Sequence, residues 1–186
     1  MSPTAVLLTP GAGSDRTHHL LVALERALAP LPCVRIDFAY RVAGRPFPDK
    51  APVLVAAVAQ AVHSLCATHG IAPSEVLLGG RSMGGRICSM AVAEGLGAAG
   101  LVLIGYPLHP PRRPQQLRTA HFGQIGVPCL FVSGTKDTFA TPEELTAATQ
   151  AIAAPVTHHW IEGGPHGLDR HDDEVLAAVK TWIGGC

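Results

Sequence analysis

Residues 76–91 read Val-Leu-Leu-Gly-Gly-Arg-Ser-Met-Gly-Gly-Arg-Ile-Cys-Ser-Met-Ala. The apolar run that begins this stretch predicts a buried strand, and its second half has the spacing of a helix. A serine between two glycines at that junction is typical of a nucleophile elbow, a sharp turn that holds the serine in a strained conformation. The glycines let strand and helix pass closely, and the helix dipole favours negative charge beside the serine. Ser82 is therefore the candidate nucleophile.

The motif also arises by chance in a glycine-rich chain, and this one has 20 glycines among 186 residues. The pattern around it favours the elbow, because short apolar runs alternate with helix-length stretches, as in repeated βα units with a parallel sheet. Most runs are continuously apolar, which indicates burial on both faces. The expected strands are Ala5–Thr9, Val34–Phe38, Val76–Gly79, Gly100–Ile104, Cys129–Ser133 and Val156–Ile161. The expected helices are Thr17–Leu28, Pro52–Thr68, Gly84–Glu94, Pro142–Ala153 and Asp172–Ile183.

The predicted fold is an α/β three-layer sandwich, a parallel sheet of about six strands with helices on both faces. The length fits a single domain over residues 1–186. One connection breaks the rhythm: residues 106–126 hold four prolines and three arginines, which predicts a loop with a short helix near Pro114–Arg118. We expect this loop to lie over the site.

The composition of the chain indicates where in the cell the protein is expected and which partners it is expected to bind. Lys+Arg and Asp+Glu balance at 14 each, so no electrostatic attraction to nucleic acid or to an anionic membrane is expected. The N-terminus lacks the pattern of a signal peptide, and no window is expected to span a membrane. Five scattered cysteines, Cys186 among them as an exposed terminal thiol, indicate reduced thiols in a cytoplasm. A small molecule is the expected partner, and the oligomeric state stays open.

Acyl transfer by serine needs a base near the hydroxyl and an acid that orients the base. Asp137 follows the predicted strand ending at Ser133, and His166 lies in a flexible loop directly after the last predicted strand. Ser, Asp, His is the chain order that the elbow motif requires. Asp137 could instead cap a turn, and Asp169 is a rival acid that would have to fold back. We predict a triad of Ser82, Asp137 and His166.

The oxyanion donors are expected from the N–H of Met83 and from the loop that follows the first strand, at Ala12 and Gly13. Gly11 in that loop allows close approach of a ligand. A Gly-Ala-Gly loop before a helix could instead hold a phosphate, but the third glycine of the dinucleotide motif and the P-loop lysine are absent. No histidine or cysteine spacing indicates a metal, and no cofactor is predicted.

Several segments carry a family resemblance over nearly the whole chain. They are Thr9–Gly13, Tyr40-Arg41 with Gly44–Pro46 and Pro48-Asp49, Gly79–Arg86, and Gly105–Pro111. The chain resembles small α/β hydrolases without a cap domain, of the dienelactone-hydrolase-like group. More narrowly, it is similar to bacterial hydrolase-like proteins related to the third regulatory subunit of the NSL acetyltransferase complex. The resemblance implies the α/β-hydrolase fold, a sheet lacking the first two strands of larger hydrolases, and the triad predicted above.

The expected activity is that of a serine hydrolase of carboxylesterase or thioesterase type, acting on small esters or thioesters through an acyl-enzyme. The alternative is a catalytically idle interaction or scaffold module on the same fold, since fold alone does not prove turnover. Arginines near the expected site could bind an anionic substrate or pair internally, and Arg86 is expected to pair with Asp37 or Asp49. The residues predicted to bind substrate are Gly11, Arg45, Arg81, Tyr106 and His109.

Overall fold

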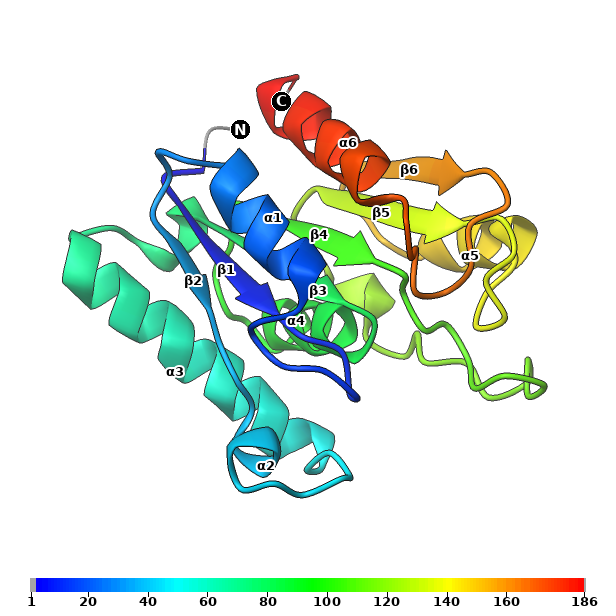
Figure 1. Ribbon diagram of the computed structural model, residues 1–186, viewed down its shortest axis with the longest axis horizontal. Helices are drawn as coiled ribbons and strands as arrows, with labels where there is room; N and C mark the ends of the chain where they lie inside the picture. The colour runs from blue at the N-terminus through cyan, green and yellow to red at the C-terminus, as the bar shows by residue number, and fades with distance from the viewer. Residues whose placement is uncertain (1–2, 186) are drawn as a thin grey trace.

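The computed structural model describes residues 3–185 as one parallel six-stranded sheet with helices on both faces (Figure 1). The strand order is β2-β1-β3-β4-β5-β6, so the chain starts inside the sheet, adds one edge, and then builds steadily toward the other. The strands are β1 (Ala5–Thr9), β2 (Cys33–Arg35), β3 (Val76–Arg81), β4 (Gly100–Ile104), β5 (Cys129–Gly134) and β6 (Val156–Ile161). The predicted α/β architecture is confirmed, and no cap domain interrupts residues 3–185.

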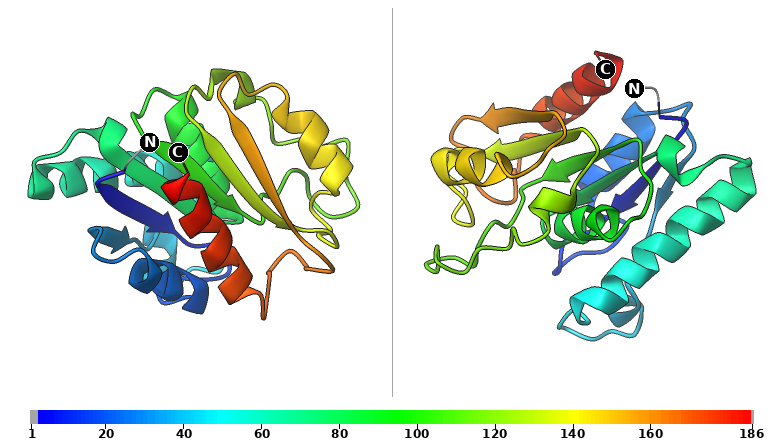
Figure 2. Two further views of the ribbon diagram at one scale, coloured as in Figure 1. Left: turned by 90° about the horizontal axis from the view of Figure 1, so that it is seen from above. Right: turned by 180° about the vertical axis from the view of Figure 1, so that it is seen from behind.

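Two helical layers enclose the sheet, as the two turned views of Figure 2 show. Leu20 and Leu24 of the first helix and Val175 and Val179 of the last share one apolar cluster with the sheet. The three other long helices pack into a second cluster on the opposite face. The first layer holds α1 (His19–Ala27) and α6 (Asp172–Gly184), and the second holds α3 (Ala51–His69), α4 (Met83–Ala93) and α5 (Pro142–Thr149).

Strand β2 is shorter than predicted and is not buried on both faces. It pairs only with β1, and Val34 is 36% exposed because β2 forms one edge of the sheet. The N–H of Ile36 still donates to the Leu8 carbonyl at 3.1 Å. The chain then turns at Phe38 into a four-residue helix, α2 (Ala39–Val42), which the sequence pattern did not predict.

Helix α5 begins as predicted but ends early. Thr141 and Glu144 form a capping box around Pro142, which fixes the start. The helix ends at Thr149 rather than Ala153. The N–H groups of Gln150, Ala151 and Ile152 bond to carbonyls three residues earlier, so the α-helical pattern stops and the chain turns toward β6.

The long connection between β4 and β5 is the predicted loop, but its helix lies elsewhere. Residues 111–117 form exposed turns, so nothing apolar anchors a helix at Pro114–Arg118. A short 3-10 helix, η2 (Phe122–Gln124), forms instead where Phe122 and Ile125 are fully buried. A second 3-10 turn, η1 (Pro73–Glu75), leads into β3.

Helix α3 has the length and composition that a membrane-spanning helix would also have, which was not singled out from the sequence. Its apolar 18-residue window has a mean hydropathy of 1.5, and the helix is long enough to cross a bilayer. In the fold it covers the sheet, with Val58 and Val62 fully buried in the core. We therefore interpret it as a helix of the outer layer.

The four cysteines between residues 3 and 185 carry free thiols, and Cys66, Cys88 and Cys129 are buried. Burial raises the pKa of the Cys88 and Cys129 thiols to about 12, so both stay protonated at neutral pH. Cys186, the expected exposed thiol, lies outside the described residues.

Candidate active site

Ser82 occupies a strained turn between β3 and α4, with φ 51° and ψ −119°. A non-glycine residue in this region costs on the order of 1–3 kcal/mol and persists only where the surroundings fix it. The Ser82 N–H donates to the Ile104 carbonyl at 2.8 Å, which is one such constraint. The side chain therefore stands at the carboxyl edge of the sheet, at the first turn of α4.

The glycines around Ser82 are required by close packing. A Cβ on Gly80 would overlap the Gly85 nitrogen, and one on Gly84 would lie 2.5 Å from the Pro10 carbonyl oxygen. Neither approach leaves room for a side chain. The motif read from the sequence thus matches a tight crossing of β1, β3 and α4.

The three predicted triad residues meet at this edge of the sheet. The Ser82 Oγ lies 2.8 Å from His166 Nε2, and His166 Nδ1 lies 2.8 Å from Asp137 Oδ2. Ser82 follows β3, Asp137 follows β5, and His166 follows β6. Both distances are those of hydrogen bonds, so a proton can pass between Ser82 and His166 while Asp137 fixes the imidazole.

Asp137 is held in place beneath the histidine. Its side chain is 1% exposed, and its Oδ1 accepts from the Phe139 N–H at 2.7 Å. The second oxygen is left for His166, whose side chain is 18% exposed and so remains open to a ligand. The rival acid Asp169 is exposed and makes no hydrogen bond to His166 within residues 3–185.

Two further features fix the His166 loop. Gly105 has φ 57°, and a Cβ there would lie 2.7 Å from the His166 carbonyl oxygen. The Phe139 ring stacks on the imidazole with a centroid separation of 3.9 Å and an interplanar angle of 26°. These contacts limit rotation of the ring and hold Nε2 toward Ser82.

The predicted oxyanion donors lie beside Ser82 to different degrees. Met83 is the first residue of α4, so its N–H has no acceptor inside the helix. Met83 and Ala12 both line the cavity at Ser82, whereas Gly13 is exposed and does not line it. The Ala12 carbonyl accepts from the Tyr40 hydroxyl at 2.8 Å, which anchors this loop to α2.

A cavity of about 360 Å³ opens at the nucleophile. It is mostly apolar but includes two arginines, from the first turn of α4 and from the loop between β4 and β5. Its lining residues are Ala12, Pro48, Asp49, Ala51, Leu54, Ser82, Met83, Arg86, Ile87, Pro107, Arg118 and Phe139.

None of the five residues predicted to bind substrate lines this cavity. Tyr106 is 1% exposed and donates its hydroxyl to the Arg118 carbonyl at 2.9 Å. His109 is buried and lies 3.2 Å from Glu144 Oε2. Arg45 is paired with Asp49 at 2.6 Å. The side chains of Tyr106, His109 and Arg45 therefore each contact other groups of the protein.

Arg81 and Gly11 lie close to each other and to Ser82. A Cβ on Gly11 would lie 3.1 Å from the Arg81 Nη1 and 3.6 Å from the Ser82 Cβ. Arg81 Nη2 approaches the Gly167 carbonyl at 3.5 Å. Arg81 thus bridges the loop after β1 and the histidine loop, and neither it nor Gly11 lines the cavity.

The expected pairing of Arg86 is wrong. Asp37 pairs with Arg16 at 3.3 Å, and Asp49 pairs with Arg45. Arg86 makes no ion pair with any carboxylate between residues 3 and 185, and its buried Nε has no hydrogen-bond partner there. Arg86 lines the cavity instead.

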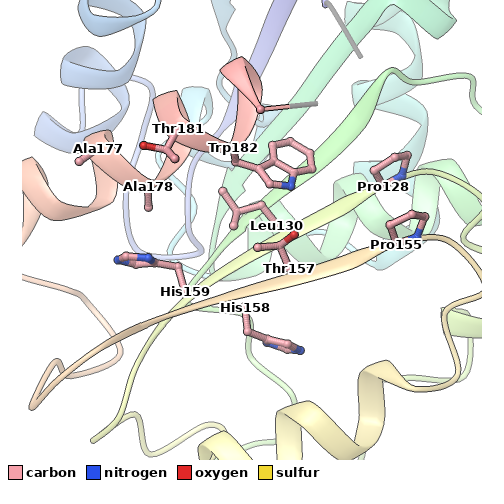
Figure 3. A pocket seen from close by; sticks show the side chains of 11 residues that line it. Pro128, Leu130, Pro155, Thr157, His158, His159, Ala177, Ala178, Thr181 and Trp182 are labelled. Carbon is pink, nitrogen blue, oxygen red and sulfur yellow. The ribbon is translucent and has the colours of Figure 1, made fainter.

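A larger hollow, of about 670 Å³, lies away from Ser82 between α6 and the edge formed by β5 and β6 (Figure 3). Leu130, Trp182 and two prolines give it apolar walls, and His158 and His159 lie at its margin. No serine lines it. Residues 3–185 also contain no group of three His, Cys, Asp or Glu side chains placed to hold a metal.

The family model described as alpha/beta hydrolase domain matches residues 2–182. The chain belongs to the alpha/beta hydrolase family. Among solved structures, Est1E from Butyrivibrio proteoclasticus superposes with a TM-score of 0.80 at 15% identity, covering 99% of this chain and 88% of that one. One such structure carries bound ferulic acid.

Two other solved structures match at similar length. A putative hydrolase from Xanthomonas campestris superposes with a TM-score of 0.71 at 21% identity over all of both chains. A putative dienelactone hydrolase from Klebsiella pneumoniae gives 0.73 at 17% identity, covering 100% of this chain and 88% of that one. At these identities the likeness establishes a shared fold.

Sequence reasoning missed three residues that shape the site. Phe139 stacks on the histidine, Tyr40 anchors the loop at Ala12, and Arg118 lines the cavity. Phe139 lies two residues after Asp137, and this closeness to the predicted acid was a usable signal. Tyr40 lies in the short helix α2 and was noted only as part of a family resemblance, and Arg118 lies in the loop between β4 and β5. No local pattern predicted that either residue would support the site.

Proposed function

We propose that the protein is a serine hydrolase that cleaves small esters or thioesters through an acyl-enzyme intermediate. The observation that carries the proposal is the pair of 2.8 Å contacts linking Ser82, His166 and Asp137 on a strained elbow. Strain of this kind and aligned acid-base partners are characteristic of a reactive serine.

The geometry supports the following steps. Ser82 Oγ attacks the substrate carbonyl carbon while its proton passes to His166 Nε2. The carbonyl oxygen becomes an oxyanion, which the N–H groups of Met83 and Ala12 stabilise beside the helix dipole. As the intermediate collapses, His166 gives the proton to the leaving alcohol or thiol. A water molecule, deprotonated by His166, then attacks the acyl-enzyme and regenerates Ser82.

The cavity supports a substrate of modest size, since about 360 Å³ lies at the low end for small-molecule sites. We further propose that residues 1–186 act as a single domain without a separate cap. The resemblance to dienelactone-hydrolase-like proteins and to relatives of the NSL subunit stays a prediction, as does a cytoplasmic location. The alternative, an idle interaction module, would leave Ser82 unreactive.

A fluorophosphonate probe tests the proposal. We expect covalent labelling at Ser82 in the wild-type chain, located by mass spectrometry of the labelled peptide. Labelling should disappear in Ser82→Ala and fall at least 100-fold in rate in His166→Ala, because the serine then lacks its base. Ser64→Ala, on the outer helix α3, serves as the matched serine control and should label normally.

Circular dichroism and thermal unfolding establish that each variant is folded. A folded wild-type chain that resists the probe and hydrolyses no nitrophenyl ester would rule out the hydrolase and favour the idle module.

A further inference from the structure

Two arginines from separate segments share the cavity wall with the candidate nucleophile. Arg86 lies one helical turn after Ser82, and its N–H donates to the Ser82 carbonyl at 3.1 Å. Arg118 comes from the loop between β4 and β5, where its N–H donates to the Leu108 carbonyl at 2.8 Å. Both also line a neighbouring hollow of about 480 Å³, so their side chains lie between the two spaces.

Neither guanidinium has a counterion within residues 3–185. No carboxylate there comes within 4 Å of Arg86 or Arg118. Asp49, the carboxylate in the cavity wall, accepts from Arg45 at 2.6 and 3.0 Å. Glu94 lines the second hollow but pairs with neither arginine. The cavity wall therefore carries two uncompensated positive charges.

The ionisable neighbours do not offset this charge. Burial and the charge of Arg86 lower the pKa of His121 to about 4, so its ring is neutral at pH 7. Burial raises the pKa of the Tyr106 phenol, which keeps it neutral as well. Burial and the nearby Arg86 lower the pKa of Arg118. Two like charges on one cavity wall are unfavourable without a counterion. Arg118 Nη1 donates to the Pro107 carbonyl at 3.4 Å, whereas the buried Arg86 Nε has no hydrogen-bond partner among residues 3–185.

We propose that Arg86 and Arg118 form a carboxylate-binding subsite, so that the substrate is a short ester or thioester whose acyl chain ends in a carboxylate. The proposal rests on the serine hydrolase function proposed above. His166 must protonate the leaving group, which places that group on the His166 side. His166 does not line the cavity, so the acyl chain occupies it and extends toward the arginines. Guanidinium groups pair with carboxylates through two parallel hydrogen bonds.

Binding can be measured without turnover. In Ser82→Ala, isothermal titration calorimetry compares monomethyl succinate with methyl 4-methylpentanoate, in which an isopropyl group replaces the carboxylate. We expect the anionic ester to bind at least tenfold more tightly. Arg86→Met or Arg118→Met should remove this difference, and Arg118→Lys should restore part of it because the charge returns. Arg113→Met, in an exposed part of the same loop, is the matched control and should keep the difference.

Turnover gives a second and separate readout. In the wild-type chain, pH-stat kinetics should show kcat/KM at least tenfold higher for monomethyl succinate than for the neutral ester. The methionine variants should lose this preference mainly through a higher KM for monomethyl succinate. Their kcat/KM for the neutral ester should fall less.

The outcomes separate the two proposals. Hydrolysis of both esters at equal efficiency, with equal binding in Ser82→Ala, would overturn the subsite and leave the hydrolase standing. Arginine-dependent binding without any turnover would keep the subsite and reject the hydrolase. Tighter binding of the corresponding phosphate-terminated ester than of the succinate would overturn the assignment to a carboxylate.

Discussion

At the scale of single residues, the orientation of His166 depends on groups on both sides of the ring. Asp137 holds Nδ1 through a hydrogen bond, and Phe139 covers one face of the imidazole at 3.9 Å. The backbone N–H of Phe139 also donates to Asp137 Oδ1. Phe139 is thus a positioning residue that acts on the base through both its ring and its backbone.

Removing the Phe139 ring should impair catalysis through the histidine. In Phe139→Ala the backbone N–H remains while the stacking contact is lost, so we expect kcat for a nitrophenyl ester to fall about tenfold. The pH profile of kcat should shift, since the environment of the imidazole changes. Phe139→Tyr keeps the aromatic face and should retain most of the activity. Equal rates and equal pH profiles for all three chains would contradict this role.

Residue patterns predicted that Ser82, Asp137 and His166 would meet, but they did not predict other parts of the candidate site. Ser82, Asp137 and His166 each follow a strand, and the carboxyl ends of parallel strands meet at one edge. Arg86 was placed near that edge, but its expected carboxylate partner was wrong, because Asp37 and Asp49 already bind closer arginines. Tyr106 and His109 looked available in sequence, yet both are buried, and burial of a loop depends on tertiary packing.

At the scale of elements, the crossing of β3 and α4 determines where the serine stands. Gly80 and Gly84 let the strand, the helix and β1 approach to backbone contact. A side chain at either position must push one of these elements away and shift the elbow.

Gly80→Ala should therefore destabilise the whole fold. A methyl group there would overlap the Gly85 nitrogen and Thr9 Oγ1, and we expect unfolding to become easier by about 3 kcal/mol or more. Gly126→Ala is the control, because a Cβ at Gly126 meets nothing within 4 Å and its φ is not positive. Urea unfolding followed by circular dichroism measures both. An unchanged midpoint for Gly80→Ala would refute the steric argument.

Hydrophobic periodicity predicted the positions of helices and strands where the segment was long or fully buried. The predictions were wrong for an edge strand, a very short helix and the turn in the long loop. The central strands were predicted well because they are buried on both faces. Strand β2 is shorter than predicted because it lies at an edge of the sheet. Helix α2 was not predicted because four residues are too few to show helical periodicity. The helix in the long loop was misplaced because Phe122, rather than the prolines, decides which turn is anchored.

At the scale of the whole molecule, one half-buried histidine couples folding to pH. His121 accepts or donates at Ser89 Oγ over 2.8 Å, and burial together with Arg86 lowers its pKa from 6.5 to about 4. The unfolded chain then binds a proton between these values that the folded chain does not. Stability from this group is complete above about pH 6.5 and is lost as the pH falls toward 4.

We expect His121→Gln to remove this part of the pH dependence. The ring is partly exposed, so after solvent screening the effect is on the order of 1–2 kcal/mol between pH 6.5 and 4. Urea unfolding at both pH values should show a smaller acid-induced loss of stability in His121→Gln than in the wild-type chain. His69→Gln, at the far end of α3, controls for the general effect of losing a histidine. The same loss in all three chains would exclude His121 as its source.

In the loop between β4 and β5, the residues that pack into the core are separate from the residues that lie on the surface. Its buried ends join the sheet, while residues 111–117 are exposed and carry no part of the core. Arg118 follows this exposed stretch, and its backbone is held by the Leu108 carbonyl and the Tyr106 hydroxyl at 2.8 and 2.9 Å. Related chains can therefore differ by insertion or deletion at residues 111–117, and so reshape the surface beside Arg118, with the buried core and the contact between Ser82 and His166 left as they are.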